Sequence, residues 1–460
     1  MNGQIAEWRR VTLKDVVTKL VDGSHNPPSK QDSGFPMLSA RNVENGSIVF
    51  DEYRYIEPIA FAQEHNRTRV ATGDVLLTIV GTIGRAAVVP QGVPPFALQR
   101  SVAVLTPKPE LLSKFLCYQL QAPAVQRYFE QNARGTAQKG VYLKTLGATP
   151  VVLPDVATQR EIVAELEKQF SRLDDAVANL QRVKANLKRY KASILKAAVE
   201  GRLVETEASL ARREGRAYET GEQLLQRILE ERRAKWNGRG KYKEPIAPVT
   251  DELPVLPEGW TWARLDSVAA LKGGITVDSK RVDPTSRSVP YLRVANVQRG
   301  FIDLTEVKHI NASPADIGDL RLEHGDVLFN EGGDRDKLGR GWVWEGQLPD
   351  CIHQNHVFRA RMYLGAMSPK LVSWWGNTFG KDYFLRVGKQ TTNLASINLG
   401  KLSEFPVPVP PQAEQLRMVQ EIERLLSVVD EVEDEVYANL QRAQALRQAT
   451  LAKAFSGEGQ

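Results

Sequence analysis

The pentapeptide Ala-Asn-Leu-Gln-Arg occurs at residues 178–182 and again, unchanged, at residues 438–442. The match belongs to a longer repeat, in which Gly-Asp-Val-Leu at 73–76 likewise returns at 325–328. Through all such matches the offset stays between 252 and 260 residues, which indicates two copies of one unit with small insertions. Each copy has the pattern of a globular block, called here a head, followed by one long helix.

Composition sets broad limits on the protein. A length of 460 residues predicts two or three domains, and a net charge of +6 is compatible with nucleic-acid binding without establishing it. The sequence lacks an apolar stretch long enough to cross a membrane, and its N-terminus lacks the apolar core of a signal peptide. Its two cysteines, Cys117 and Cys351, are too few for a disulfide framework or a zinc site. We therefore expect a cytoplasmic protein.

The two long helical stretches show the apolar pattern of a coiled coil. Each follows a proline-rich segment, at 150–154 and 406–411, which blocks helix and defines where the helix begins. Apolar residues then recur at three- and four-residue steps. The predicted seam consists of Ile162, Leu166, Phe170, Leu173, Val177, Leu180, Leu187, Ile194, Met418, Ile422, Leu425, Val429, Val432, Val436, Leu440 and Leu451.

Charge predicts how these helices pair, because the first is basic and the second acidic. Antiparallel pairing sets Arg182 and Lys184 opposite the acidic residues at 430–434 and brings Lys191 near 421–423. Parallel pairing would instead bring acidic residues together. We expect an antiparallel coiled coil with one head at each end and a pseudo-twofold axis. The alternative is that each helix packs on its own head.

The heads have the pattern of mixed α/β domains. Short apolar runs such as 75–80 and 101–105 are strand-like, whereas 110–131 and 369–386 are helical. The predicted fold class is α+β, with two α/β domains in tandem repeat separated by the long helices. The predicted parts are heads at 1–157 and 258–411, helices at 158–202 and 412–457, and a linker at 203–257. The linker holds a helix from about Thr220 to Trp236 and should return the chain along the coiled coil.

Catalytic signatures are incomplete. Residues 26–29 (Asn-Pro-Pro-Ser) resemble an adenine methyltransferase motif, but Ser29 replaces the aromatic residue and no glycine-rich cofactor loop precedes it. Residues 376–382 are one residue short of a phosphate-binding loop, so packing is the better interpretation. His353 and His356 have metal-like spacing without a third ligand. The chain is therefore interpreted as a binding protein.

The sequence resembles the specificity subunit of type I restriction–modification enzymes over essentially its whole length. The motifs that carry this resemblance are Pro-Pro-Gln-Ala-Glu-Gln at 410–415, Ala-Val-Glu-Gly-Arg-Leu at 198–203, Ala-Phe-Ser-Gly at 454–457, the helical stretch 219–236 and Leu-Pro-Glu-Gly-Trp at 256–260. Residues 22–28 resemble a turn near the start of the family's recognition domains. The entry of the first helix, at 154–159, is a weaker copy of the Pro-Pro-x-x-Glu-Gln pattern.

This resemblance implies a non-catalytic subunit. Its two target-recognition domains would each read one half of a bipartite, asymmetric site in double-stranded DNA. The coiled coil would set the spacing and dock two copies of the modification (methyltransferase) subunit, which carries S-adenosylmethionine and methylates adenine. Restriction/translocase subunits that use ATP and Mg²⁺ would complete the complex, and this chain would hold no cofactor or metal.

Residues that read DNA are chosen by chemistry, because polar tips on glycine-rich turns bring a long side chain to phosphate or base edges. In the first head the candidates are Thr82, Gly84, Arg85, Gln99, Arg100, Arg134, Thr136, Gln138 and Lys139. In the second head they are Asn330, Arg335, Lys337, Arg340, Gln354, Asn355, His356, Lys389, Gln390, Thr392 and Asn393. The alternative for each is a solvated turn.

Two other classes of function compete with this interpretation. An enzyme that both reads and modifies DNA would need cofactor motifs that the sequence lacks. A coiled-coil scaffold whose heads bind proteins would associate with DNA weakly and with little dependence on salt, whereas binding through phosphates weakens steeply as salt rises.

Overall fold

A computed structural model describes residues 8–135, 138–236, 240–277, 284–333, 337–363, 365–390 and 395–456. The chain forms two compact units. Unit 1 comprises Met1–Val183 with Glu435–Gln460, and unit 2 comprises Lys184–Asp434. Each unit holds one head and part of both long helices, α6 (Val156–Val199) and α13 (Gln412–Phe455).

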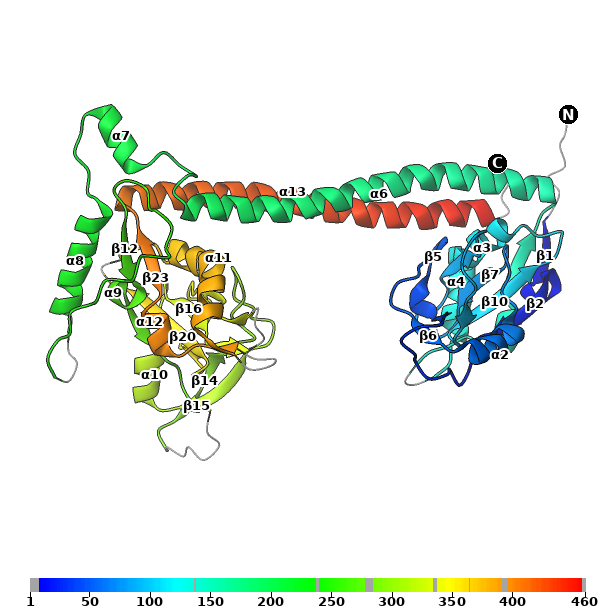
Figure 1. The fold of residues 1–460 in the computed structure, drawn as a ribbon, viewed down its shortest axis with the longest axis horizontal. Helices are drawn as coiled ribbons and strands as arrows, with labels where there is room; N and C mark the ends of the chain where they lie inside the picture. The colour runs from blue at the N-terminus through cyan, green and yellow to red at the C-terminus, as the bar shows by residue number, and fades with distance from the viewer. Residues whose placement is uncertain are drawn as a thin grey trace. The chain divides into compact units, whose positions relative to one another are not determined.

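The first head is built on a four-stranded antiparallel sheet (Figure 1). Its strand order is β2 (Val17–Asp22), β10 (Val102–Pro107), β7 (Val75–Thr78) and β8 (Ala86–Val88). Helix α3 (Ser113–Gln121) packs on the last three of these strands. The central strands are apolar and buried on both faces, as in a strand covered from both sides.

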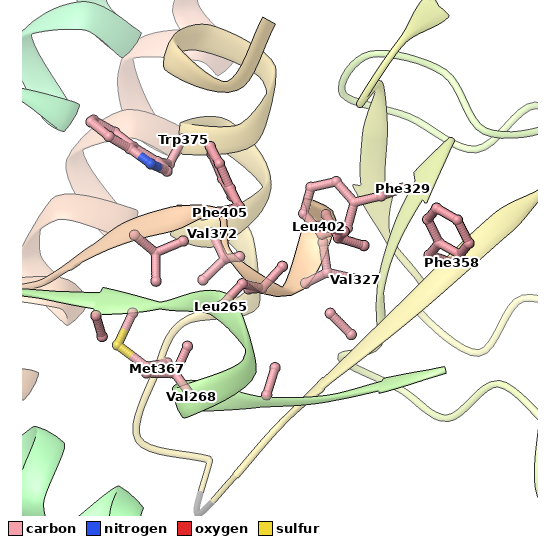
Figure 2. Packing of buried hydrophobic residues seen from close by; sticks show 14 of the residues in the cluster. Leu265, Val268, Val327, Phe329, Phe358, Met367, Val372, Trp375, Leu402 and Phe405 are labelled. Atoms are coloured by element: carbon pink, nitrogen blue, oxygen red, sulfur yellow. The ribbon is translucent and has the colours of Figure 1, made fainter. Parts of the chain in front are cut away.

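The second head repeats this sheet in the same order. It runs β13 (Ala269–Lys272), β20 (Val357–Met362), β16 (Val327–Asn330) and β18 (Gly341–Val343), again with antiparallel pairs. Helix α11 (Pro369–Val387) takes the place of α3. Aromatic and aliphatic side chains from α11, β16 and the segment before β23 fill the space between helix and sheet, as Figure 2 shows for Trp375, Phe329 and Phe405.

Smaller sheets repeat as well. In the first head β3 (Phe35–Leu38) lies between β6 (Arg54–Ile56) and β9 (Ala97–Leu98), and β1 (Arg9–Thr12) pairs with β11 (Pro150–Leu153). In the second head β14 (Arg287–Leu292) lies between β15 (Lys308–Ala312) and β19 (Ile352–His353), and β12 (Thr261–Arg264) pairs with β23 (Pro406–Val409). The repeat in sequence is therefore a repeat in topology, and the predicted fold class is confirmed.

The remaining elements are short. Those of unit 1 are α1 (Leu13–Val16), a 3-10 helix (Ala40–Asn42), β4 (Val43–Glu44), β5 (Ser47–Ile48), α2 (Pro58–Thr68), α4 (Pro123–Asn132) and α5 (Leu143–Gly147). Those of unit 2 are α7 (Glu207–Glu214), α8 (Gly221–Ala234), α9 (Leu265–Val268), α10 (Pro314–Leu320), β17 (Gly332–Gly333), β21 (Lys389–Gln390), β22 (Ala395–Ser396) and α12 (Leu399–Ser403).

The repeated motifs have repeated structural roles. The buried amides of Asn42 and Asn296 each accept a hydrogen bond from a backbone N–H three residues earlier and donate to two later carbonyls. The buried carboxylates of Asp74 and Asp326 each accept from a backbone N–H three residues earlier and pair with a cation on another strand of the same main sheet, Lys19 or Arg361. Buried polar groups of this kind are kept because they satisfy otherwise unpaired backbone groups.

The long helices pair antiparallel in both units. In unit 1, Leu451 of α13 packs with Leu166 and Phe170 of α6. In unit 2, the early α13 residues Met418 and Ile422 pack with Ala198, close to the end of α6. Each helix start therefore meets the partner's end, as predicted.

The register of this pairing differs from the predicted one. The Lys191 ammonium contacts the carboxylates of Asp430 (2.6 Å) and Glu433 (2.7 Å), and does not lie beside Glu421 and Glu423. Val432, expected in the seam, is 39% exposed, whereas Val429 and Val436 are buried. The packing of the apolar residues determines the register of the two helices. The exposed ion pairs do not determine it, because each contributes only tenths of a kcal/mol to the stability of the pair.

Two further expectations are corrected. The helix predicted at 110–131 is two helices, α3 and α4, because Pro123 begins a new helix and Ala122 before it is extended. The linker does not return along the coiled coil. Helix α8 begins at a Thr220 capping box and buries Leu224 and Ile228 in the core of the second head.

No helix among the described residues is long and apolar enough to span a membrane.

Candidate nucleic-acid interface

The predicted loops of the first head are joined by backbone hydrogen bonds at one end of its main sheet. The Ile79 N–H donates to the Ser101 carbonyl (2.9 Å), and the Gly81 N–H donates to the Lys139 carbonyl (3.1 Å). The Arg100 N–H donates to the Ser24 carbonyl (2.9 Å), which adds the turn after β2. The structure thus brings together the loops at 81–85 and 99–101 with the described residues 134–135 and 138–140.

The side chains of this region are basic and mostly unpaired. Thr82, Arg100, Arg134, Gln138 and Lys139 are exposed, whereas Arg85 and Gln99 are half-buried and Gly84 is buried; Thr136 lies outside the described residues. Among the described residues, none forms an ion pair with Arg85, Arg100, Arg134 or Lys139. By contrast, the nearby Arg67 guanidinium lies 3.0 Å from the Asp22 carboxylate. Several unpaired cations on one set of joined loops form an electrostatic surface suited to phosphate.

The loops of the second head meet in the same way. The Glu331 N–H donates to the His356 carbonyl (2.9 Å), and the Ile397 N–H donates to the Glu331 carbonyl (2.8 Å). A three-stranded ribbon of β17, β22 and β21 adds the segment that carries Lys389 and Gln390. The described parts of these loops, 330–333, 337–340, 354–356 and 388–390, therefore converge, as their counterparts do in the first head.

In the second head, more of the candidate side chains form an ion pair or a hydrogen bond within the protein than in the first head. Lys389 and His356 are exposed, and Lys337, Arg340, Gln354 and Asn355 are half-buried. The His356 ring contacts the Glu331 carboxylate, and the Arg340 guanidinium donates to the Gln298 amide oxygen (2.5 Å). Arg335, Thr392 and Asn393 lie outside the described residues, and only the backbone of Gln390 is described.

Asn330 is corrected as a contact candidate. It is fully buried at the end of β16, and its amide donates to the carbonyls of Val297 (2.9 Å) and Val294 (3.3 Å). The side chain therefore holds a neighbouring loop instead of reaching the surface. The counterpart in the first head, Thr78, is also buried and bonds within its own hairpin.

Arg85 and Arg340 occupy equivalent positions. Each follows a glycine in the left-handed region, Gly84 (φ +91°) or Gly339 (φ +64°), and each directly precedes the strand at the edge of the main sheet. The Arg85 carbonyl accepts from the Thr78 N–H (2.9 Å), and the Arg340 carbonyl accepts from the Asn330 N–H (2.9 Å). One hairpin geometry thus presents an arginine in both heads.

Sequence reasoning noted the turn at 22–28, which follows the first strand of the main sheet in the first head, but did not include it or its counterpart in the second head among the DNA-contact candidates. A Cβ on Gly23 would lie 2.3 Å from the Leu98 carbonyl oxygen, and one on Gly274 would lie 2.0 Å from that of His353. Only glycine allows this approach, which sets the turn against the loop that carries Gln99 or Gln354. In the first head the turn adds His25, whose ring lies 2.7 Å from the Asp22 carboxylate. The two glycines are 251 residues apart, close to the offset of the other repeat matches, so the repeat is the signal that relates these turns.

The incomplete catalytic motifs have structural roles. Residues 376–382 lie inside α11, and a Cβ on Gly376 would meet the Phe329 ring at 2.7 Å, so the packing interpretation is confirmed. His353 is fully buried, and burial lowers its pKa to about 4. Burial raises the pKa of both Cys117 and Cys351 to about 12. No group of His, Cys, Asp or Glu suited to holding a metal occurs among the described residues.

Comparison with known proteins shows which family and fold the chain resembles. Residues 5–189 match a family model described as the type I restriction modification DNA specificity domain. A solved structure on complex assembly and conformational transition of the type I R-M system contains a chain with TM-score 0.63 and 19% identity. The match covers 98% of both chains and shows the fold.

Two curated relatives align with most of the chain. The chain is 20% identical to the EcoKI specificity subunit of Escherichia coli (strain K12), over 99% of this chain and 90% of that one. It is 21% identical to the StySPI specificity subunit of Salmonella potsdam, over 93% and 83%. Residues 5–189 thus match the type I DNA specificity domain, and over nearly its whole length the chain is similar to specificity subunits of type I restriction enzymes.

Proposed function

We propose that each head reads one half of a bipartite, asymmetric site in double-stranded DNA. The observation that carries this proposal is that equivalent loops present different side chains on one framework. Where the first head has Gln99 and Arg100, the second has Gln354 and Asn355, each next to a close-packed glycine turn. Different polar tips on the same backbone are what reading two different base sequences requires.

The chemistry of these tips supports contact with both bases and phosphate. Arginine can donate two hydrogen bonds to guanine, and glutamine or asparagine can bond twice to adenine. The exposed cations Arg134 and Lys139 are suited to phosphate, whose neutralisation releases counterions and strengthens binding at low salt. The similarity of residues 5–189 to a DNA specificity domain, and of the chain to specificity subunits of type I restriction enzymes, supports the same assignment.

The remaining parts of the proposal concern assembly. The antiparallel helices would set the spacing between half-sites and dock two methyltransferase subunits, one for each copy of the repeat. S-adenosylmethionine, ATP and Mg²⁺ would act on partner subunits, with restriction/translocase subunits completing the complex. In this arrangement the chain contributes no catalytic group of its own. The continuous 44-residue helices and the paired repeat support a frame of this kind.

Selection from random duplex DNA tests the proposal. The full chain, co-purified with its methyltransferase subunit, is incubated with a library carrying about 40 random base pairs, and the retained duplexes are sequenced. We expect two short selected blocks of different sequence, separated by an unselected gap of constant length. Enrichment of one contiguous block, or no enrichment while the complex stays intact, would contradict half-site reading.

A further inference from the structure

Each head has a buried amide side chain that contacts the backbone immediately after the equivalent arginine. In the first head the Gln121 amide, at the end of α3, donates to the Ala86 carbonyl (3.2 Å). In the second head the Asn377 amide, within α11, donates to the Gly341 carbonyl (2.7 Å) and accepts from the Gly341 N–H (3.1 Å). Ala86 and Gly341 are the residues that follow Arg85 and Arg340.

The same carbonyls accept a second hydrogen bond from the other side. The Gly46 N–H donates to the Ala86 carbonyl (2.9 Å), and the Gly300 N–H donates to the Gly341 carbonyl (3.4 Å). Both donors are left-handed glycines in a turn, with φ of +89° in each case. A carbonyl held by a turn on one side and a helix amide on the other cannot shift without breaking a buried hydrogen bond.

The backbone before the arginine is also held. The Arg85 N–H donates to the Thr78 hydroxyl (2.9 Å), and the Gly84 carbonyl accepts from the Gln126 amide (2.9 Å). In the second head the Gly339 N–H donates to the Asn330 carbonyl (3.2 Å). The Cα atom of each arginine is thus fixed by bonds on both sides, which is what a side chain needs in order to meet a base edge within a few tenths of an ångström.

We propose that Gln121 and Asn377 are positioning residues that hold Arg85 and Arg340 to read equivalent base pairs, one in each half-site. The inference rests on the proposed function and adds which arginines discriminate bases and what orients them. Two hydrogen bonds from one guanidinium to guanine require a defined approach, whereas a phosphate contact tolerates movement. A built support is therefore expected behind a base-reading arginine and not behind a phosphate-binding one.

The test replaces each amide and maps adenine methylation by single-molecule sequencing. The full chain is co-expressed with its methyltransferase subunit in cells that otherwise lack this methylation. Gln121→Leu removes the donor to Ala86, and we expect methylation to spread to sites changed at one base pair of one half-site, with discrimination lowered about tenfold. Asn377→Leu should do the same at one base pair of the other half-site, and Arg85→Ala should relax the same base pair as Gln121→Leu.

A matched control lies on the same helix. The Gln119 amide is also buried and donates to the Val152 carbonyl (3.1 Å), away from the Arg85 hairpin. Gln119→Leu loses a comparable core hydrogen bond, so it should lower the melting temperature to a similar extent while leaving the methylated motif unchanged. If Gln121→Leu leaves the motif unchanged, or relaxes both half-sites equally, the positioning role is wrong.

A second variant keeps the inference testable if Gln121→Leu does not fold. Arg85→Lys keeps the charge and leaves the core untouched but removes the two-bond fork, so it must relax the same single base pair. An unchanged motif with Arg85→Lys overturns the inference. If the unaltered chain itself yields no split motif, the proposed function is wrong, and the inference that rests on it is wrong too. If the unaltered chain yields a split motif but the variants do not change it, only the inference is wrong.

Discussion

Gln159 and Gln415 make the same pair of hydrogen bonds at the starts of the two long helices. Each side-chain oxygen accepts from the backbone N–H of a helix N-cap residue, Leu112 (2.8 Å) or Ser368 (2.8 Å). Each side-chain nitrogen donates to a proline carbonyl, Pro154 (2.9 Å) or Pro410 (3.0 Å). Both amides are buried, so each long helix is fastened to its head by the same polar contact.

Replacing either glutamine should destabilise the protein. Gln159→Ala or Gln415→Ala leaves a backbone N–H and a carbonyl buried without these partners, and we expect a loss of about 2 kcal/mol in the free energy of unfolding. Urea denaturation followed by circular dichroism measures it. Gln169→Ala is the control, because Gln169 is exposed on α6 and should change stability by less than about 0.5 kcal/mol. Equal losses in all three variants would contradict the fastening role.

Two apolar residues of α13 that were both predicted to lie in the coiled-coil seam should respond differently to truncation. Ile422 is fully buried, whereas Val432 is 39% exposed. Ile422→Ala should cost about 2–5 kcal/mol because it leaves a cavity, and Val432→Ala should cost less than about 0.5 kcal/mol. Thermal unfolding of the two variants compares them directly. A larger loss at Val432 would show that the register derived from Lys191 is wrong.

The exposed cations Arg134 and Lys139 of the first head should contribute to affinity without contributing to sequence preference. Arg134→Ala or Lys139→Ala removes one phosphate contact and should reduce the magnitude of the slope of log K against log[salt] by about 0.9. Fluorescence anisotropy of labelled duplex at several salt concentrations gives this slope. Arg172, exposed on α6, serves as the control cation. A slope that stays constant in both variants would exclude the loop at Arg134 and Lys139 from the DNA interface.

His353 should make the stability of the second head depend on pH. Burial lowers its pKa to about 4 from the usual 6.5, so the unfolded chain binds more protons between these values. The free energy of unfolding is therefore unaffected by this ring above pH 6.5. It decreases as the pH falls toward 4, by about 3 kcal/mol in total. His353→Asn can still donate to the Val357 carbonyl and does not titrate. Urea unfolding at pH 7.0 and 4.5 should show a smaller difference for this variant; an equal difference would contradict the assignment.

The sequence repeat predicted the general architecture because each repeated motif has a structural role, as Asn42 and Asn296 illustrate. The charges predicted the direction of the helix pair but not its register, since apolar packing outweighs exposed ion pairs. The break at Pro123 was missed because the apolar pattern continues across it. The domain boundaries stay a prediction.

The sequence allowed the positions of the loops in the candidate site to be predicted, but it was less informative about which side chains are exposed there. Glycine and polar residues located the turns, and the structure joins them at one end of each main sheet. Asn330 was misjudged because a residue at the end of a strand can point inward, and a polar type does not reveal this. Gln121 and Asn377 were invisible to sequence reasoning because they differ in type and lie on helices remote in sequence from the arginines.

The most direct test of the central claim is single-molecule sequencing of adenine methylation in the genome of cells with and without this chain, the methyltransferase subunit being present in both. The account predicts that methylation at one split, asymmetric motif is present with the chain and absent without it. An identical methylation pattern in the two strains, with both proteins shown to be expressed, would contradict a role in sequence specificity.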